Sequence, residues 1–207
     1  MLENVKNEEI LFLDIETVPQ YSDYKQVPDA LKEFWDKKSA RISAEDKSPE
    51  ELYQRAGIYA EFGKIICISV GLIVEKEGQQ FFRIKSFSNE NEAILLSDFA
   101  DMLNKFCAKP KATLCAHNGK EFDFPYIARR MLINGITIPQ ILDVAGKKPW
   151  EVSFLDTMEL WKFGDYKHYT SLGLLTQIFD IPTPKDDIDG SQVAEVYYVE
   201  KNLERIV

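Results

Sequence analysis

The feature that most constrains this chain is an apolar run near its start that two acidic residues interrupt. The segment EILFLDIETVPQ, residues 9–20, predicts a buried strand whose end carries Asp14 and Glu16. Side chains alternate faces along a strand, so both carboxylates lie on one face, with their Cα atoms about 7 Å apart. Burying an ionised carboxylate is costly unless it is paired, hydrogen-bonded or bound to a metal.

Two interpretations of this acidic pair remain open at this point. Carboxylates this close repel, and each raises the pKa of the other unless a cation lies between them. Carboxylate oxygens, together with water and a substrate phosphate, are ligands that suit Mg²⁺ or Mn²⁺. In the simpler alternative, Glu16 lies in water at a strand end and Asp14 opens a turn towards Pro19.

A second polar segment follows about a hundred residues later, in LCAHNGKEFDFPYIARR. A buried strand is predicted to end at residues 117–119, and a helix to begin with Asp123 in or beside its first turn. Sites in open α/β sheets gather at such strand ends. In isolation Asp123 suits a helix N-terminus, and Asn118-Gly119 suits a turn. Beside an Asp-x-Glu strand these simpler explanations become weaker.

The order of predicted elements indicates an α/β fold with a mixed β-sheet flanked by helices. A first strand is followed by a polar, mostly helical stretch, a β-hairpin, an amphipathic helix over residues 92–107, a strand and further helices. Asn89 and Glu92 are expected to form a capping box for the helix over 92–107. The stretch at about 20–62 is long for a connection, which suggests a functional flap or a small helical subdomain.

Charge and hydropathy narrow the classes of partner. The 207 residues include 25 basic and 34 acidic side chains, a net charge of −9, which argues against a general nucleic-acid binder of the basic-patch kind. The negative charge is still compatible with an enzyme that binds phosphates through metal ions, because bound cations make the local charge positive. The acidic N-terminus has no apolar run and no stretch is long enough for a membrane span, so we expect a soluble, cytoplasmic protein with no membrane partner.

The pair of motifs resembles a known group of nucleases. DIET followed by HNGKEFDFPYI resembles the first two motifs of the DEDD 3'-5' exonuclease superfamily. DIETVP, HNGKEFDFPYIARR and YTSLGLLTQIFDIPTPKDDIDGSQV look most like stand-alone relatives of the family B DNA polymerase proofreading domain. The resemblance covers nearly the whole chain and implies a ribonuclease H-like fold in one exonuclease domain over residues 1–207. It also implies two divalent ions, Mg²⁺ or Mn²⁺, with Asp14 and Glu16 in the first ligand motif and Asp123 in the second.

The resemblance implies a function as well. The implied activity is that of a metal-dependent 3'-5' exonuclease that hydrolyses terminal phosphodiester bonds of a single strand. The implied substrate is DNA rather than RNA, and the implied role is in DNA repair. Thr17, through its backbone, and Asn118 match positions that lie near the 3'-terminal nucleotide in the superfamily, and Phe122 would wedge the terminal bases. A non-catalytic nucleic-acid-binding module with the same fold and an RNA-trimming exoribonuclease are the alternatives. The sequence does not identify a protein partner.

One departure from the superfamily concerns its fourth acid, which belongs to a third motif, Tyr-x-x-x-Asp or His-x-x-x-x-Asp. Neither version follows Asp123, since His117 belongs to the second motif and His168 is followed five residues later by Gly173. Either the chain is cut before a third motif that would lie just past Val207, or the protein lacks its fourth ligand and the water-orienting Tyr of that motif. The predicted last helix stops in mid-turn, which favours the cut. Weak or single-metal occupancy and little activity would follow.

Three further features near the motifs have two interpretations each. Asp156 in FLDTMELW either touches the site or caps a helix that starts at Thr157. Arg129 and Arg130 follow Asp123 on its helix, where one could contact a phosphate or both could face solvent. The segment WKFGDYKHYTSL suits stacking against a single strand, or core aromatics with solvated lysines. Its aromatic and basic residues are Trp161, Phe163, Tyr166, Tyr169, Lys162 and Lys167.

Overall fold

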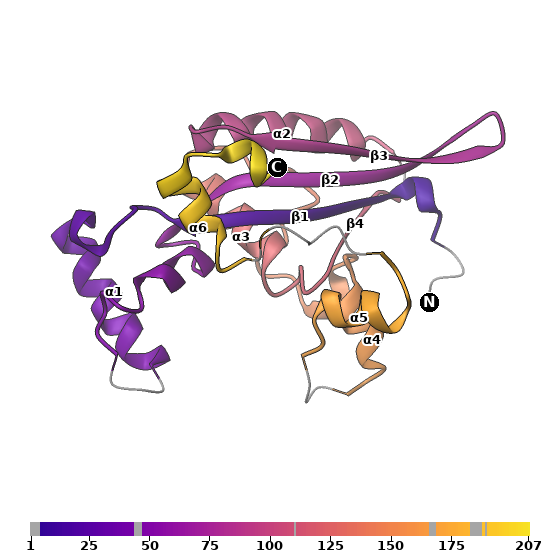
Figure 1. Ribbon diagram of the computed structural model, residues 1–207. Helices are drawn as coiled ribbons and strands as arrows, with labels where there is room; N and C mark the ends of the chain where they lie inside the picture. The colour runs from indigo at the N-terminus through magenta and orange to yellow at the C-terminus, as the bar shows by residue number, and fades with distance from the viewer. Residues whose placement is uncertain (1–4, 44–46, 110, 166–168, 183–187, 189) are drawn as a thin grey trace.

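A five-stranded sheet forms the centre of the protein, with strand order β3-β2-β1-β4-β5 (Figure 1). The computed structural model describes residues 5–43, 47–109, 111–165, 169–182, 188 and 190–207, so residues 166–168 of the aromatic segment lie outside the description. β1 is antiparallel to β2, and β2 to β3, whereas β4 runs parallel to both β1 and β5. The sheet is therefore mixed, as predicted. Its strands are β1 (Ile10–Pro19), β2 (Gly63–Lys76), β3 (Gln79–Ser88), β4 (Thr113–Ala116) and β5 (Leu155–Asp156).

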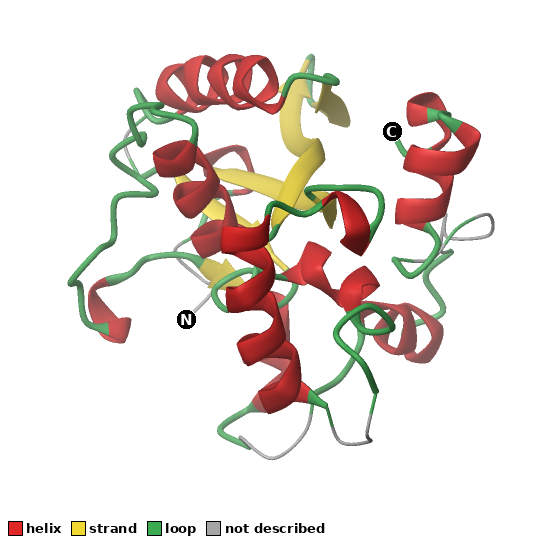
Figure 2. Ribbon diagram, turned by 90° about the vertical axis from the view of Figure 1, so that its left-hand side faces the viewer, coloured by secondary structure: helices red, strands yellow, loops and turns green. Residues whose placement is uncertain are grey.

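The main hydrophobic core lies between one face of the sheet and two helices, α2 (Glu92–Phe106) and α3 (Asp123–Ile133). Leu13 and Ile15 of β1 point into this core, where they join apolar residues of α2 and α3. Figure 1 shows α2 lying along β2 and β3, and Figure 2 shows helices on both sides of the sheet. Because strand side chains alternate, Asp14 and Glu16 belong to the opposite face.

The N-terminus of α2 differs from the prediction. Asn91, not Asn89, caps the helix, and its Oδ1 accepts a hydrogen bond from the Ala93 N–H (3.0 Å). Glu92 does not close a capping box. It is buried and forms an ion pair with Arg130 of α3. A buried partner of opposite charge stabilises the carboxylate more than an exposed local cap would.

The C-terminal segment covers the end of the opposite sheet face. Helix α6 (Val193–Glu195) runs into a π-helical turn over Val196–Glu200, so the predicted last helix is short and irregular. Val193 packs on Val18 of β1 and Ile66 of β2. The Tyr198 hydroxyl donates to the carbonyl of Pro19, the last residue of β1 (2.5 Å). This segment is therefore fastened to the strand that carries the two acids.

Residues 21–62 form a helical unit at one end of the sheet, beyond the ends of β1 and β2 (Figure 1). Helix α1 (Asp29–Ile42) and a 3₁₀ helix over Tyr53–Ile58 enclose a small core around Trp35, which is fully buried. The Trp35 indole N–H donates to the carbonyl of Pro49 (2.8 Å). A unit with its own core fits the small-subdomain interpretation better than a loose flap.

Two short helices, α4 (Thr157–Lys162) and α5 (Leu172–Ile178), lie near the β5 edge of the sheet. Ser171 caps α5 by accepting from the Leu174 N–H (3.2 Å). Among the helices that the structure describes, none combines the length and the apolarity that a membrane crossing needs.

Candidate active site

The two acids of the first motif lie side by side on the face of β1 that points away from the main core. Asp14 pairs in register with Ser69 of β2, and Glu16 with Cys67. Asp14 is exposed and Glu16 is half-buried. The pairing then shifts, since Thr17 pairs with Ile65 and leaves Ile66 as an extra residue. The bulge increases the local twist of the strands next to the acidic pair.

Asp123 begins α3 and is buried, with only 3% of its surface exposed. Its pKa is raised to about 7, first by burial and then by the negative charge of Asp14, while the backbone N–H groups of Asp123 and Ile15 lower it. These contributions place Asp123 against the β1 backbone and within electrostatic reach of Asp14. Its Oδ1 atom is buried and has no hydrogen-bond partner.

The loop before α3 is held by Asp156, the last residue of β5. Its Oδ1 accepts from the Asn118 N–H (2.9 Å) and its Oδ2 from the Lys120 N–H (3.1 Å). Oδ1 also accepts from Met158, which makes Asp156 the N-cap of α4. The helix-cap interpretation is confirmed. Both carboxylate oxygens accept backbone N–H groups, so Asp156 orders the loop, and its negative charge is also one cause of the raised pKa of Asp123.

The turn at Asn118-Gly119 is tight. Asn118 has a left-handed backbone conformation (φ 63°), which asparagine tolerates better than most residues. A Cβ atom on Gly119 would lie 2.4 Å from that of Ala116 and 3.0 Å from the Phe124 ring. Only glycine therefore lets β4 turn into α3 at this point, which sets where Asp123 begins the helix.

The residues predicted to bind substrate lie on β1 (Thr17) and in the loop that leads into α3 (Asn118 and Phe122). The Asn118 Oδ1 is buried without a hydrogen-bond partner, as is the Oδ1 of Asp123. Phe122 immediately precedes α3, is half-buried, and packs its ring against Tyr126 at 5.4 Å between centroids. Thr17 lies close enough to Tyr126 to lower its pKa against the larger effect of burial. The structure thus brings Thr17 and Phe122 to one tyrosine that sequence reasoning did not single out.

The three predicted metal ligands come from two elements, Asp14 and Glu16 from β1 and Asp123 from α3. The negative charge of Asp14 is one cause of the raised pKa of Asp123. In the described part of the chain, no three His, Cys, Asp or Glu side chains are grouped in a way that could already hold an ion. The residue types still suit a hard divalent cation, which prefers carboxylate oxygens as ligands. One of these oxygens, Asp123 Oδ1, is buried and accepts no hydrogen bond. The assignment of Asp14, Glu16 and Asp123 stays a prediction.

The arginine and aromatic alternatives come out differently. Arg130 is buried, and its donors bind the Glu92 carboxylate and the Ala60 carbonyl. Both predictions for Arg130, a phosphate contact and exposure to solvent, are therefore wrong. Phe163 and Tyr169 are 93% and 68% exposed. The core interpretation is therefore wrong for these two rings. The Tyr169 ring packs edge-on against the ring of His117, the residue before Asn118, with 6.4 Å between the ring centroids.

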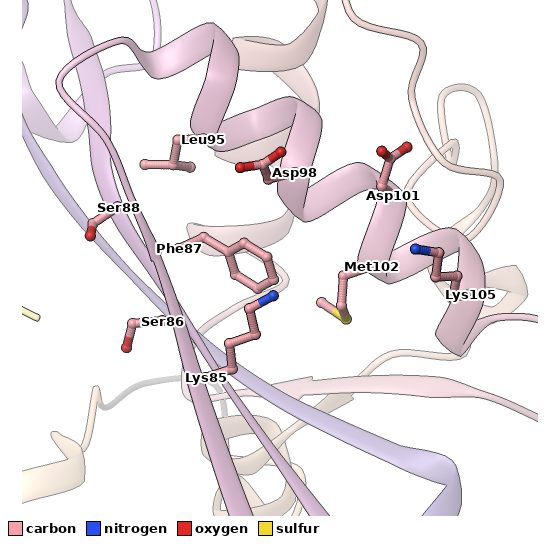
Figure 3. A pocket seen from close by; sticks show the side chains of 9 residues that line it. All are labelled: Lys85, Ser86, Phe87, Ser88, Leu95, Asp98, Asp101, Met102 and Lys105. Carbon is pink, nitrogen blue, oxygen red and sulfur yellow. The ribbon is translucent and has the colours of Figure 1, made fainter.

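A cavity of about 640 Å³ lies between β3 and α2 (Figure 3). Side chains of both signs line it, among them Lys85, Asp98, Asp101 and Lys105. β2 separates β3 from β1, so the cavity is at the far edge of the sheet from β4. Mixed charge gives no net attraction for a phosphate, and we do not assign the catalytic site to it.

Two solved structures are similar to this chain, and the first of them supports the same type of fold. The family B DNA polymerase of the hyperthermophilic archaeon Pyrobaculum calidifontis has a TM-score of 0.53 and 15% identity, over 95% of this chain and 22% of that one. The zinc-bound E. coli ExoI–ssDNA complex has a TM-score of 0.46 and 11% identity, over 95% of this chain and 42% of that one. This chain spans less than half the length of either protein. Among curated proteins, none matches it.

A family model matches residues 58–207 and is described as "Predicted 3'-5' exonuclease related to the exonuclease domain of PolB". The matched range contains Asp123 and starts after β1, so Asp14 and Glu16 lie outside it. It covers well over half of the chain, and the mixed sheet flanked by helices is the ribonuclease H-like arrangement expected for such exonucleases. The chain belongs to this family of predicted 3'-5' exonucleases related to the exonuclease domain of family B DNA polymerases.

Proposed function

We propose that the protein is a metal-dependent 3'-5' exonuclease that removes nucleotides from the 3' end of single-stranded DNA. The observation that carries the proposal is the Asp123 carboxyl group, which is buried next to Asp14 with an oxygen that no protein donor satisfies. A buried polar atom without a partner is rare in proteins and costs stability, so a ligand is the simplest reason for keeping it. Membership of the exonuclease family supports the same conclusion.

The proposed ligand is Mg²⁺ or Mn²⁺, held by Asp14, Glu16 and Asp123. Bound divalent ions would supply a hydroxide nucleophile and positive charge for the phosphate oxygens. Asp123 would lose its proton when an ion binds, because a nearby cation favours the charged form of a carboxyl group. Asp14 lies in the middle of β1 and is exposed, so its carboxylate is accessible to an ion from solvent.

The residues around the acids would bind the 3' end of the strand. The Asn118 Oδ1 lacks a protein donor and can accept a hydrogen bond from the terminal nucleotide. Phe122 presents a half-buried ring beside Asp123 and can stack on a base, which is sequence-tolerant. The backbone of Thr17 follows Glu16 directly and is the third predicted contact. Such contacts use stacking and hydrogen bonds, so they do not need the basic surface that this acidic chain lacks.

The test is shortening of a 5'-labelled single-stranded oligodeoxynucleotide, followed on a denaturing gel with Mn²⁺, with Mg²⁺ and with EDTA. We expect a ladder that shortens from the 3' end with either ion and stays intact in EDTA. Asp14→Asn and Asp123→Asn should reduce shortening to the level without protein. Asp143→Asn is the matched control, because Asp143 is exposed and distant in sequence from both motifs.

Three results would contradict parts of the proposal. An unchanged rate in Asp14→Asn would show that the assigned site is wrong. Binding of the oligomer without shortening, in either ion, would favour a non-catalytic binding module. Shortening of a matched RNA oligomer but not of DNA would identify an exoribonuclease.

A further inference from the structure

Tyr126 lies one turn after Asp123 on α3 and links three segments of the chain. It is buried, and its hydroxyl donates to the carbonyl of Gly57 (2.7 Å) in the helical unit of residues 21–62. The Thr17 side chain on β1 lies close enough to this hydroxyl to oppose part of the effect of burial on the pKa of Tyr126. Burial raises the pKa of Tyr126, so the hydroxyl keeps its proton across the range in which enzymes work.

Two glycines make this junction possible. A Cβ atom on Gly63 would lie 2.3 Å from the Tyr126 hydroxyl and 2.7 Å from the Gly57 carbonyl oxygen. A Cβ atom on Gly57 would lie 3.0 Å from the carbonyl carbon of Val18 and 3.1 Å from the nitrogen of Pro19. Both glycines are therefore needed for close approach, since a side chain at either position would push α3 or β1 away.

A second contact one turn further along α3 acts in parallel. Arg130 donates from Nη1 to the carbonyl of Ala60 (2.9 Å) and from Nε to the Glu92 carboxylate (2.9 Å). Glu92 also accepts from the backbone N–H of Ile65 on β2 (2.7 Å). The buried pair is thus hydrogen-bonded on both sides, the condition under which such a pair is stable. Residues 57–60 are fixed to α3 at two points, one turn apart.

From these contacts we propose that Tyr126 is a positioning residue, which holds α3 against β1 so that Asp123 stays next to Asp14 in the proposed metal site. The inference rests on the proposed function. Tyr126 is hydrogen-bonded to Gly57, which lies against the backbone of Val18 and Pro19 on β1, and it starts from the same helical face as Asp123. Residues 57–63 serve as a brace rather than as a flap.

The variant that tests this role is Tyr126→Phe, which keeps the ring packing on Phe122 and removes only the hydroxyl. Mn²⁺ binding is measured from the free-ion signal in electron paramagnetic resonance, without substrate. We expect about fivefold weaker Mn²⁺ binding, the size of one net hydrogen bond. Hydrogen–deuterium exchange over residues 57–63 should be faster in the variant, with or without the ion.

The matched control is Tyr24→Phe. It removes a hydroxyl that donates to Asp36 Oδ1 (2.7 Å) within the same helical unit but has no link to α3. Tyr24→Phe should leave Mn²⁺ binding unchanged. Equal weakening in both variants would indicate general loosening and overturn the positioning role, as would unchanged binding or unchanged exchange in Tyr126→Phe. If the wild-type protein bound no Mn²⁺, the proposed function would fail, and the positioning role with it.

Discussion

Replacing Asp123 with asparagine should make the metal-free protein more stable above pH 7. The Asp123 pKa is raised from 3.8 to about 7 by burial and by the charge of Asp14. That difference corresponds to about 4 kcal/mol of unfolding free energy at pH values above 7. Asparagine has nearly the same shape as the protonated acid and carries no charge, so it avoids this cost. For a domain of this size we expect a gain in Tm of about 10 °C.

The sign follows from which state of the protein binds the proton more tightly. Between pH 3.8 and 7 the folded protein keeps the Asp123 proton and the unfolded chain releases it. The stabilising contribution of the protonated acid is therefore complete below pH 3.8 and is lost as the pH rises through 7. Wild type and Asp123→Asn should thus be equally stable at pH 4 and differ most at pH 8. Mn²⁺ should reduce the difference at pH 8, because it binds the wild-type carboxylate.

The assay is urea unfolding in EDTA at several pH values, read from tryptophan fluorescence. Asp143→Asn removes one negative charge from the surface and should change stability by less than about 0.5 kcal/mol at any pH. A constant difference between wild type and Asp123→Asn across this pH range would refute the reasoning. It would mean that Asp123 is charged at little cost, and the argument for a ligand at its unpartnered oxygen would fail with it.

Three further changes test other parts of the molecule. Asp14→Asn should lower the pKa of Asp123 and shift the pH dependence of urea stability to lower pH, because the charge of Asp14 is one cause of the raised value. Glu92→Gln should cost about 3 kcal/mol in urea unfolding, because Arg130 stays buried without a counter-charge, whereas Glu92→Leu with Arg130→Met should cost less. Trp35→Ala should cost about 3–5 kcal/mol and expose residues 21–62 to limited proteolysis, because it empties the centre of that unit's core.

The sheet and the place of the acids could be predicted because both depend on local pattern. Alternation along residues 9–20 puts Asp14 and Glu16 on one face, and the structure has them on the face away from the main core. The capping role of Asp156 could be inferred from its position before a helix. Its bonds to the loop at Asn118 and Lys120 could not, because they join segments nearly forty residues apart.

The buried network around α3 shows where local pattern fails. Glu92 near a helix start reads as a capping residue, and Arg130 on a helix next to a proposed phosphate site reads as a ligand. Both expectations assumed that charged side chains stay near water. The structure pairs them because α2 and α3 bring opposite charges together inside the core, with the Ile65 N–H and the Ala60 carbonyl completing the hydrogen bonds. The sequence spacing of these groups carries no signal for that contact.

The same limit explains why Tyr126 was overlooked and Asp123 was not. Asp123 follows a recognisable turn and an amphipathic helix follows it, so its placement is local information. Tyr126 lies three residues later and reads as a core aromatic, and its ring does pack in the core. Its hydroxyl becomes informative only when Gly57, Gly63 and Thr17 are seen to meet it. Acids in a motif indicate which groups hold an ion, but the contacts that fix their spacing come from distant glycines and carbonyls. The geometry of such a site is therefore best sought in the structure, among the buried donors one turn away from each ligand.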